Sequence, residues 1–244
     1  SVRPGEESFW TTAKPFQPVL KEGRIYGRGT EDNGQSMIAS VFAVKALRNL
    51  SLRPRRTVAL AFVADEEQGS RYGIQHLISK GLFNTNDLIL VPDGGNQDGT
   101  FIEITEKSAL WFRVRTVGKQ IHASMPDKGL NAHRAGMVYA LAVDKMLHDK
   151  YSAKDPYFEP PESTFEPTKK EKNVDAVNII PGEDIIHFDC RILPSYDIEE
   201  ILKDIKQLAA EYEKKTGAKI EIEPLHKSVA PKPTDPDSEI VLAM

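Results

Sequence analysis

Acidic side chains follow two short apolar segments of this sequence. Residues 57–64 (TVALAFVA) form a nearly continuous apolar run that leads toward Glu66 and Glu67, and residues 87–91 (DLILV) lead toward Asp93. Both runs predict strands that are buried on both faces, as in a parallel sheet. Ligands of such sheets bind at the carboxyl ends of the strands. We therefore expect these carboxylates to converge at one edge of a sheet.

A further acidic residue, Asp32, lies in the glycine-rich segment 27–34 (GRGTEDNG). Several ionised carboxylates in one cleft repel one another, and a divalent cation relieves that repulsion. Carboxylates suit Zn²⁺, Mg²⁺ and Mn²⁺, so the spacing alone does not choose the metal. Each residue alone has a simpler interpretation: Asp32 as a helix N-cap, Glu66 and Glu67 as a solvated loop, and Asp93 as a turn residue. Their joint placement favours a metal site.

The order of the predicted helices and strands differs between the two halves of the chain. Helical spacing over 35–50 and 71–80 alternates with the two apolar runs and predicts an α/β layer with a parallel sheet, whereas residues 1–23 are expected to be loop. The second half predicts strands and helices in the order β-α-β-β-α-β of a ferredoxin-like unit. These elements are expected at 109–117, 131–147, 174–180, 184–192, 198–215 and 218–222.

Domain boundaries follow from this change of order. We expect a first domain over 1–107 that continues at 226–244, and a second over 108–225. Cap signals at Asp197 and Gly217 bound the last helix. The polar, proline-rich residues between 151 and 173 are expected to form a mobile insertion.

Composition excludes some classes of function. Hydrophobic residues make up 40% and charged residues 28%, with a net charge of −4 and both signs interspersed, which does not suggest a nucleic-acid partner. The longest apolar run, Val58–Ala64, is far shorter than the roughly 20 residues of a membrane span, so no membrane partner is expected. The single cysteine, Cys190, permits no intrachain disulfide and fits the cytoplasm.

Several motifs occur in a fixed order along the chain. They are Gly27-Arg28-Gly29-Thr30-x-Asp32-x-Gly34, Asp65-Glu66-Glu67, Asp93-Gly94, Gly118-Lys119-x-x-His122-Ala123-Ser124-x-Pro126, Asn178-x-x-Pro181-Gly182 and Asp189-x-Arg191-x-x-Pro194. Together they resemble the M20 family of zinc metallopeptidases and deacylases, which includes aminoacylases, succinyl-diaminopimelate desuccinylases, acetylornithine deacetylases and carboxypeptidases. The resemblance implies a zinc-exopeptidase-like α/β catalytic domain with an inserted ferredoxin-like lid or dimerisation domain.

The resemblance also implies roles for the site residues. Asp32 would bridge two zinc ions, Glu67 would bind one of them and Asp93 the other, with Co²⁺ or Mn²⁺ as substitutes. Glu66 would be the general base that takes a proton from a metal-bound water, and His122 would stabilise the oxyanion. The implied reaction is metal-dependent hydrolysis of an amide bond in an N-acyl amino acid or a short peptide.

Asn178 and Arg191 resemble substrate-binding positions. Arg191 suits bidentate pairing with a substrate carboxylate, and the alternative is a structural pair with Asp189. In the family, the histidine equivalent to His122 often acts across a dimer. The resemblance therefore implies a homodimer through the second domain.

Two histidine ligands of the family pattern are absent from this sequence. One belongs to a His-x-Asp motif expected just before Ser1, and the other is expected beyond Met244. The simplest expectation is a sequence that is incomplete at both ends. The alternative is a truncated or inactive family member that serves as a binding or assembly module. Glu66 favours the enzyme, because a binding module needs no general base at that position.

Overall fold

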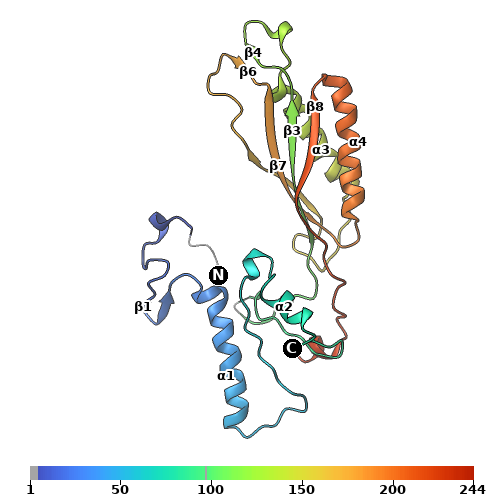
Figure 1. The fold of residues 1–244 in the computed structure, drawn as a ribbon. Helices are drawn as coiled ribbons and strands as arrows, with labels where there is room; N and C mark the ends of the chain where they lie inside the picture. Colours follow the sequence, from blue (N-terminus) through green and yellow to red (C-terminus); the bar gives the residue numbers. More distant parts are fainter. Residues whose placement is uncertain (1–4, 97) are drawn as a thin grey trace. The chain divides into compact units, whose positions relative to one another are not determined.

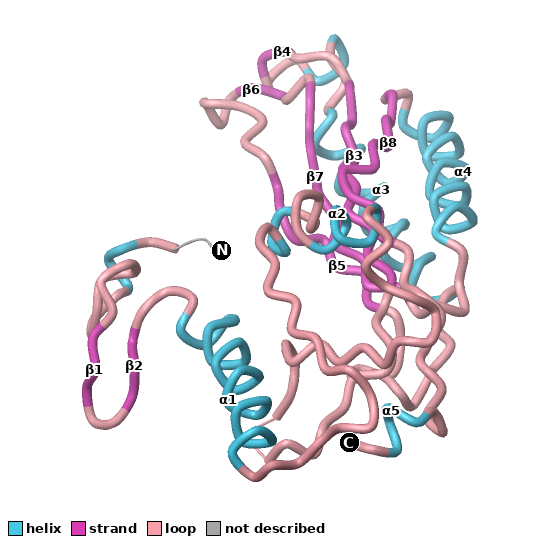
Figure 2. Tube along the Cα trace, turned by 60° about the horizontal axis from the view of Figure 1, so that its bottom comes forward, coloured by secondary structure: helices cyan, strands magenta, loops and turns pink. Residues whose placement is uncertain are grey.

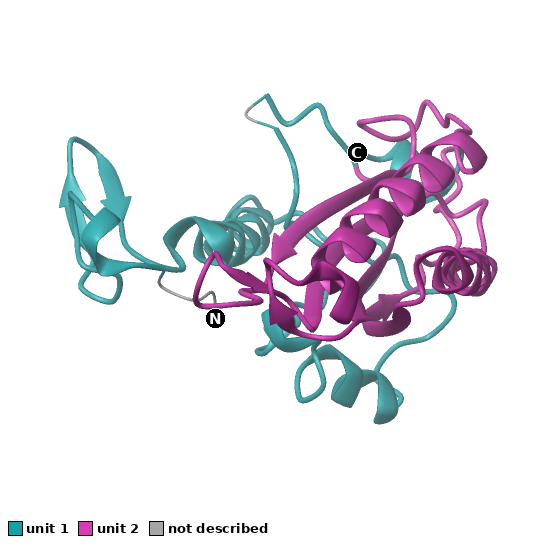
Figure 3. Ribbon diagram, turned by 90° about the horizontal axis from the view of Figure 1, so that it is seen from above, with its two compact units in different colours: residues 1–102, 237–244 teal, residues 103–236 magenta. Residues whose placement is uncertain are grey.

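The computed structural model describes residues 5–96 and 98–244, and the chain divides into two compact units, coloured separately in Figure 3. Unit 1 comprises residues 1–102 and 237–244, and unit 2 comprises residues 103–236. None of the helices in the described part of the chain is long and apolar enough to cross a membrane.

Unit 2 is built on an antiparallel four-stranded sheet with the strand order β5-β7-β3-β8 (Figure 1). Its strands and helices are β3 (Ser108–Val117), α3 (Ala132–Lys150), β5 (Thr164–Lys170), β7 (Glu183–Ile192), α4 (Ile198–Thr216) and β8 (Lys219–Ser228). Helix α3 packs on β3, β5 and β7, and helix α4 packs on β8 and on α3. This chain order and this strand order confirm the ferredoxin-like fold.

Strand β3 shows why the core of unit 2 lies on one face of the sheet. Its side chains alternate, so Leu110 and Phe112 are fully buried whereas Trp111 is exposed. Phe112 lies opposite Phe188 of β7, and the two rings stack with their centroids 4.8 Å apart. The single cysteine, Cys190, is buried on the same strand, β7. The apolar face of the sheet is therefore the face that the two helices cover.

Both helices of unit 2 begin and end with the signals that the sequence carries. The side chain of Asn131 accepts a hydrogen bond from the Arg134 amide, and that of Asp197 accepts one from the Glu199 amide. Gly217 ends α4 in the left-handed region, with φ of 75°. The helices predicted over 131–147 and 198–215 are confirmed.

A buried hydroxyl joins the two helices. Tyr139 of α3 is fully buried, and its hydroxyl donates a 2.7 Å hydrogen bond to the Ile205 carbonyl of α4. We expect Tyr139→Phe to lower the free energy of unfolding by about 1 kcal/mol, because the ring stays and only the hydrogen bond is lost. Urea unfolding followed by circular dichroism measures this. The matched control is Tyr157→Phe, whose ring is 66% exposed, and equal midpoints for the two variants would contradict the prediction.

The second strand of the ferredoxin-like unit was predicted at the wrong place. The sheet uses β5, within the segment expected to be a mobile insertion, and of residues 174–180 only Ile179–Ile180 (β6) form a strand. Strand β5 pairs with β7 alone and is an edge strand, where Pro167 and lysines are tolerated. Its fully buried Phe165 ties it to the core.

Unit 1 contains helices α1 (Ser36–Asn49), α2 (Ile74–Ser79) and α5 (Glu239–Leu242). The helices predicted over 35–50 and 71–80 are confirmed, the second of them in shorter form. The segment 1–23, expected to be loop, contains strand β1 (Val19–Lys21), which forms a hairpin with β2 (Arg24–Tyr26). Both residues of its turn, Glu22 and Gly23, have positive φ, which is the backbone that a tight hairpin requires.

The two parallel strands predicted in unit 1 are not formed. Residues 57–64 and 87–91 are loop, as the tube of Figure 2 shows, and Val58 is 49% and Leu88 40% exposed. A strand exists only where a neighbour supplies the partners of its backbone N–H and C=O groups. Neither segment pairs with another within the described residues, so the prediction of a parallel sheet is wrong for this structure.

Candidate functional site

The four acidic residues of unit 1 that the sequence predicted as a site lie in three separate turns. Asp32 belongs to the turn Thr30–Gln35 that leads into α1, Glu66 and Glu67 open the short helical turn Glu66–Gln68, and Asp93 lies in a bend. The first turn closes through a 2.9 Å hydrogen bond from the Gly34 amide to the Gly29 carbonyl. A Cβ on Gly34 would meet that carbonyl oxygen at 2.5 Å, which explains the glycine.

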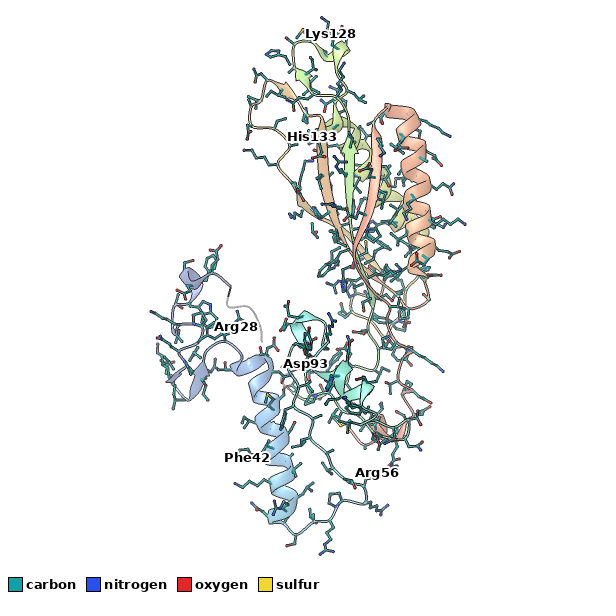
Figure 4. The ribbon with its side chains drawn as sticks, in the orientation of Figure 1. Arg28, Phe42, Arg56, Asp93, Lys128 and His133 are labelled. Atoms are coloured by element: carbon teal, nitrogen blue, oxygen red, sulfur yellow. The ribbon has the colours of Figure 1, made fainter. Side chains whose placement is uncertain are left out.

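A side-chain hydrogen bond connects the first turn with the third. The Asn33 amide nitrogen donates to Asp93 Oδ1 at 2.7 Å, and Figure 4 labels Asp93 near the start of α1. The peptide bond between Asp32 and Asn33 is cis. Asn33 carries no signal in the sequence beyond its position next to Asp32 in the glycine-rich segment, because its partner lies 60 residues away.

Glu66 is the residue on which the acidic groups of the three turns have an effect. Partial desolvation raises the pKa of Glu66, and the negative charges of Glu67, Asp93 and Asp32 raise it further. A raised pKa makes a carboxylate a better acceptor for a proton.

Asp65 fixes the turn from which Glu66 projects. It adopts the left-handed region with φ of 61°, which aspartate tolerates better than most residues. Its Oδ2 accepts a 2.7 Å hydrogen bond from the Tyr72 amide. This bond anchors the turn to the segment that leads into α2.

The donor chemistry around Glu66 fits part of a site for a hard divalent cation. Carboxylate oxygens come from three turns, and two further oxygens nearby in sequence, Asn33 Oδ1 and Asp65 Oδ1, are buried without a hydrogen-bond partner among the described residues. However, no three His, Cys, Asp or Glu side chains of the described chain are arranged so that they could hold a metal ion. The residues present thus supply carboxylates for a metal centre without completing one.

Unit 2 brings together two of the predicted site residues on a short two-stranded β-ribbon formed by β4 (Ile121–His122) and β6. Strand β4 pairs with β6, and His122 lies opposite Ile179. His122 Nε2 lies 3.3 Å from the side-chain amide nitrogen of Asn178, and His122 Nδ1 lies 2.7 Å from Ser124 Oγ. The sequence analysis placed Ser124 in a motif but gave it no role.

Close backbone contacts hold this ribbon to the rest of unit 2. The Gly118 amide donates to the Gly182 carbonyl at 2.8 Å, and the Ala132 amide donates to the Pro181 carbonyl at 3.0 Å. A Cβ on Gly118 would meet the Leu130 carbonyl oxygen at 2.2 Å. The close backbone approach at Gly118 explains the glycine of this motif and places His122 and its neighbours.

A buried carboxylate lies near the base of the ribbon. Asp184 is 1% exposed, and its oxygens accept hydrogen bonds from Lys170 at 2.6 Å and from Asn173 at 2.8 Å. His133 Nδ1, on α3, lies 2.9 Å from Oδ1 of the same carboxylate. The cluster stabilises the start of β7, and the sequence analysis missed it because its members come from distant segments.

Arg191 pairs with Asp189 within strand β7. Its Nε and Nη2 donate to the two carboxylate oxygens at 2.8 and 3.1 Å, and the arginine side chain is half exposed. The sequence left open whether Arg191 binds a substrate carboxylate or pairs with Asp189, and in this structure it pairs with Asp189. A substrate carboxylate would have to compete with Asp189 for the guanidinium.

Comparison with known proteins links these motifs to metallohydrolases. Residues 104–217 match the model of the M20 peptidase dimerisation domain. An uncharacterized metallohydrolase from Methanocaldococcus jannaschii is 39% identical over 99% of this chain and 61% of its own length. A succinyl-diaminopimelate desuccinylase from Alkalilimnicola ehrlichii is 28% identical over 84% of this chain and 54% of its own length.

A solved structure supports the fold. A tripeptidase from Staphylococcus aureus matches 93% of this chain and 57% of its own with a TM-score of 0.60 at 18% identity. At this identity the likeness concerns the fold alone. The chain spans roughly half to three-fifths of the relatives that it matches.

Proposed function

We propose that this chain is a member of the M20 family and supplies the proton-transferring glutamate and several carboxylate ligands of a metal-dependent amidohydrolase. The observation that carries the proposal is the raised pKa of Glu66, to which the charges of Glu67, Asp93 and Asp32 contribute. The hydrogen bond from Asn33 to Asp93 supports it. Unit 1 is the catalytic unit in this proposal, and unit 2 is the lid or dimerisation unit.

Each residue has one task in the proposed reaction. Asp32, Glu67 and Asp93 would hold metal, with two zinc ions as the expected complement. The bound metal supplies a Lewis acid that polarises the amide carbonyl. Glu66 accepts the proton of the attacking water on a carboxylate oxygen and returns it to the leaving amine nitrogen.

Residues of unit 2 act on the substrate. His122 donates a hydrogen bond to the oxyanion that develops on the carbonyl, and Asn178 beside it contacts the acyl or peptide group. Arg191 binds a substrate carboxylate when it exchanges Asp189 for the substrate. The proposed substrate is an N-acyl amino acid, including an N-succinyl one, or a short peptide, and the match to a dimerisation domain supports a homodimer.

Metal analysis tests this proposal. We expect the protein expressed from its full coding sequence to contain zinc, or cobalt or manganese in its place, near two equivalents per chain at saturation. Chelation is expected to abolish hydrolysis, and returning the metal is expected to restore it. A metal-free preparation with full activity would contradict the proposal.

One observation favours a second function. The described residues include no complete set of metal ligands, as in a family member that has kept the fold and lost catalysis. Such a protein would act as a binding or assembly module. It would bind no metal at micromolar concentration and would hydrolyse no N-acyl amino acid even when expressed from its full coding sequence.

A further inference from the structure

The contacts of His122 bear on which of its ring nitrogens carries the proton. Nδ1 lies 2.7 Å from Ser124 Oγ and 3.2 Å from the Ser124 backbone nitrogen, which donates to it. Nε2, on the other side of the ring, lies 3.3 Å from the Asn178 side-chain amide. His122 and Ser124 are both exposed on the ribbon, so little packing constrains the imidazole ring. These hydrogen-bonding contacts therefore orient it.

Only one of these partners has a fixed role in hydrogen bonding. The Ser124 hydroxyl can donate or accept, and a rotation of about 180° exchanges the donor and acceptor ends of the Asn178 amide. A backbone N–H can only donate. Since the Ser124 amide donates to Nδ1, that nitrogen must be an acceptor, and a neutral His122 ring carries its proton on Nε2.

The Ser124 hydroxyl and the Asn178 amide then orient to match this proton position. The Ser124 hydroxyl donates its hydrogen to Nδ1 as well, and Asn178 turns its Oδ1 toward the Nε2 hydrogen. The opposite arrangement, with the proton on Nδ1, would place two N–H groups against each other at 3.2 Å. Only the first arrangement satisfies all three partners.

We propose that Ser124 is a positioning residue that holds His122 as the neutral tautomer with its proton on Nε2. The proposal rests on the proposed function, in which His122 donates to the oxyanion. With the proton on Nε2, the ring carries its donor on the side away from Ser124, where an oxyanion would replace Asn178 Oδ1 as the acceptor. With the proton on Nδ1, the same side would offer a lone pair, which repels the developing negative charge.

The first test observes the ring itself and needs no activity. Long-range ¹H–¹⁵N spectra of the labelled protein distinguish a protonated ring nitrogen from an unprotonated one, and His122→Ala identifies the His122 signals by their loss. At about pH 8.5, where an ordinary imidazole is neutral, we expect the proton on Nε2. A proton on Nδ1 would overturn the proposal.

The second test removes the hydroxyl. Because residue 124 keeps its backbone N–H in Ser124→Ala, we expect this variant to keep the proton on Nε2. It should hold the ring less firmly and lower kcat about five- to tenfold with little change in KM, as the loss of one hydrogen bond suggests. Ser124→Thr keeps a hydroxyl and is expected to restore kcat. The matched control is Ser195→Ala, on an exposed turn of the same unit.

The outcomes separate this proposal from the proposed function. A Ser124→Ala protein with the wild-type kcat, or with the His122 proton on Nδ1, would overturn the role of Ser124. A His122→Ala protein that stays fully active would instead overturn the catalytic role of His122, whichever tautomer the spectra show.

Discussion

The Glu66→Gln protein is expected to lose at least ~10²-fold in kcat for amide hydrolysis and to keep its metal content. Glutamine nearly matches glutamate in size but cannot take up a proton from water. In the proposed site Glu66 transfers protons, whereas Asp32, Glu67 and Asp93 hold the metal, so coordination should survive the change. The measurements are steady-state kinetics and elemental analysis of the protein expressed from its full coding sequence.

The neighbouring residue provides the matched control. Glu67→Gln makes the same chemical change one residue further along the same short turn, but at an expected metal ligand. This variant should lose metal, and its activity should recover partly at high metal concentration. If Glu66→Gln instead loses metal and Glu67→Gln does not, the roles of the two glutamates are reversed.

The sequence predicted unit 2 well because its signals are local. Apolar alternation in β3 and the caps at Asp197 and Gly217 depend on neighbours within a few residues. Strand β5 was missed because an edge strand is mostly exposed and therefore carries little apolar pattern beyond Phe165. Its place in the sheet is set by pairing with β7, which the sequence of β5 does not reveal.

The sequence predicted unit 1 less well because strands depend on partners. The apolar run 57–64 has the composition of a buried strand, yet composition alone supplies no backbone partner. The helices α1 and α2 form nevertheless, since a helix satisfies its hydrogen bonds within its own segment. Thus the two predicted helices of this unit appear without the sheet, and its predicted strands do not.

The sequence pointed to the acidic residues around Glu66 but not to the contacts between them. Spacing pointed to Asp32, Glu66, Glu67 and Asp93, and their mutual effect on the pKa of Glu66 agrees with that expectation. The bond from Asn33 to Asp93 joins residues whose closeness only the fold creates. The same holds for the contact between the Ser124 amide and His122 Nδ1, which depends on the turn after β4.

A His122→Ala protein is expected to lose roughly 10²-fold in kcat with unchanged metal content, which corresponds to about 3 kcal/mol for one oxyanion donor. His122 belongs to unit 2, whereas the carboxylates belong to unit 1. Metal binding should therefore be independent of this side chain. The matched control is His148→Ala, an exposed histidine on α3 of the same unit that binds the Asp144 carbonyl of its own helix. Equal losses in the two variants would indicate a general effect on unit 2.

Mixing two inactive variants tests whether His122 acts across a dimer. If it completes the partner's site, a dimer of one His122→Ala chain and one Glu66→Gln chain has one site with both residues intact. That mixed dimer should recover part of the wild-type activity, up to about half per dimer, because the other site lacks both residues. Subunit exchange must first be demonstrated with chains that carry different labels. If exchange is complete and no activity returns, His122 either acts within its own chain or has no part in the reaction.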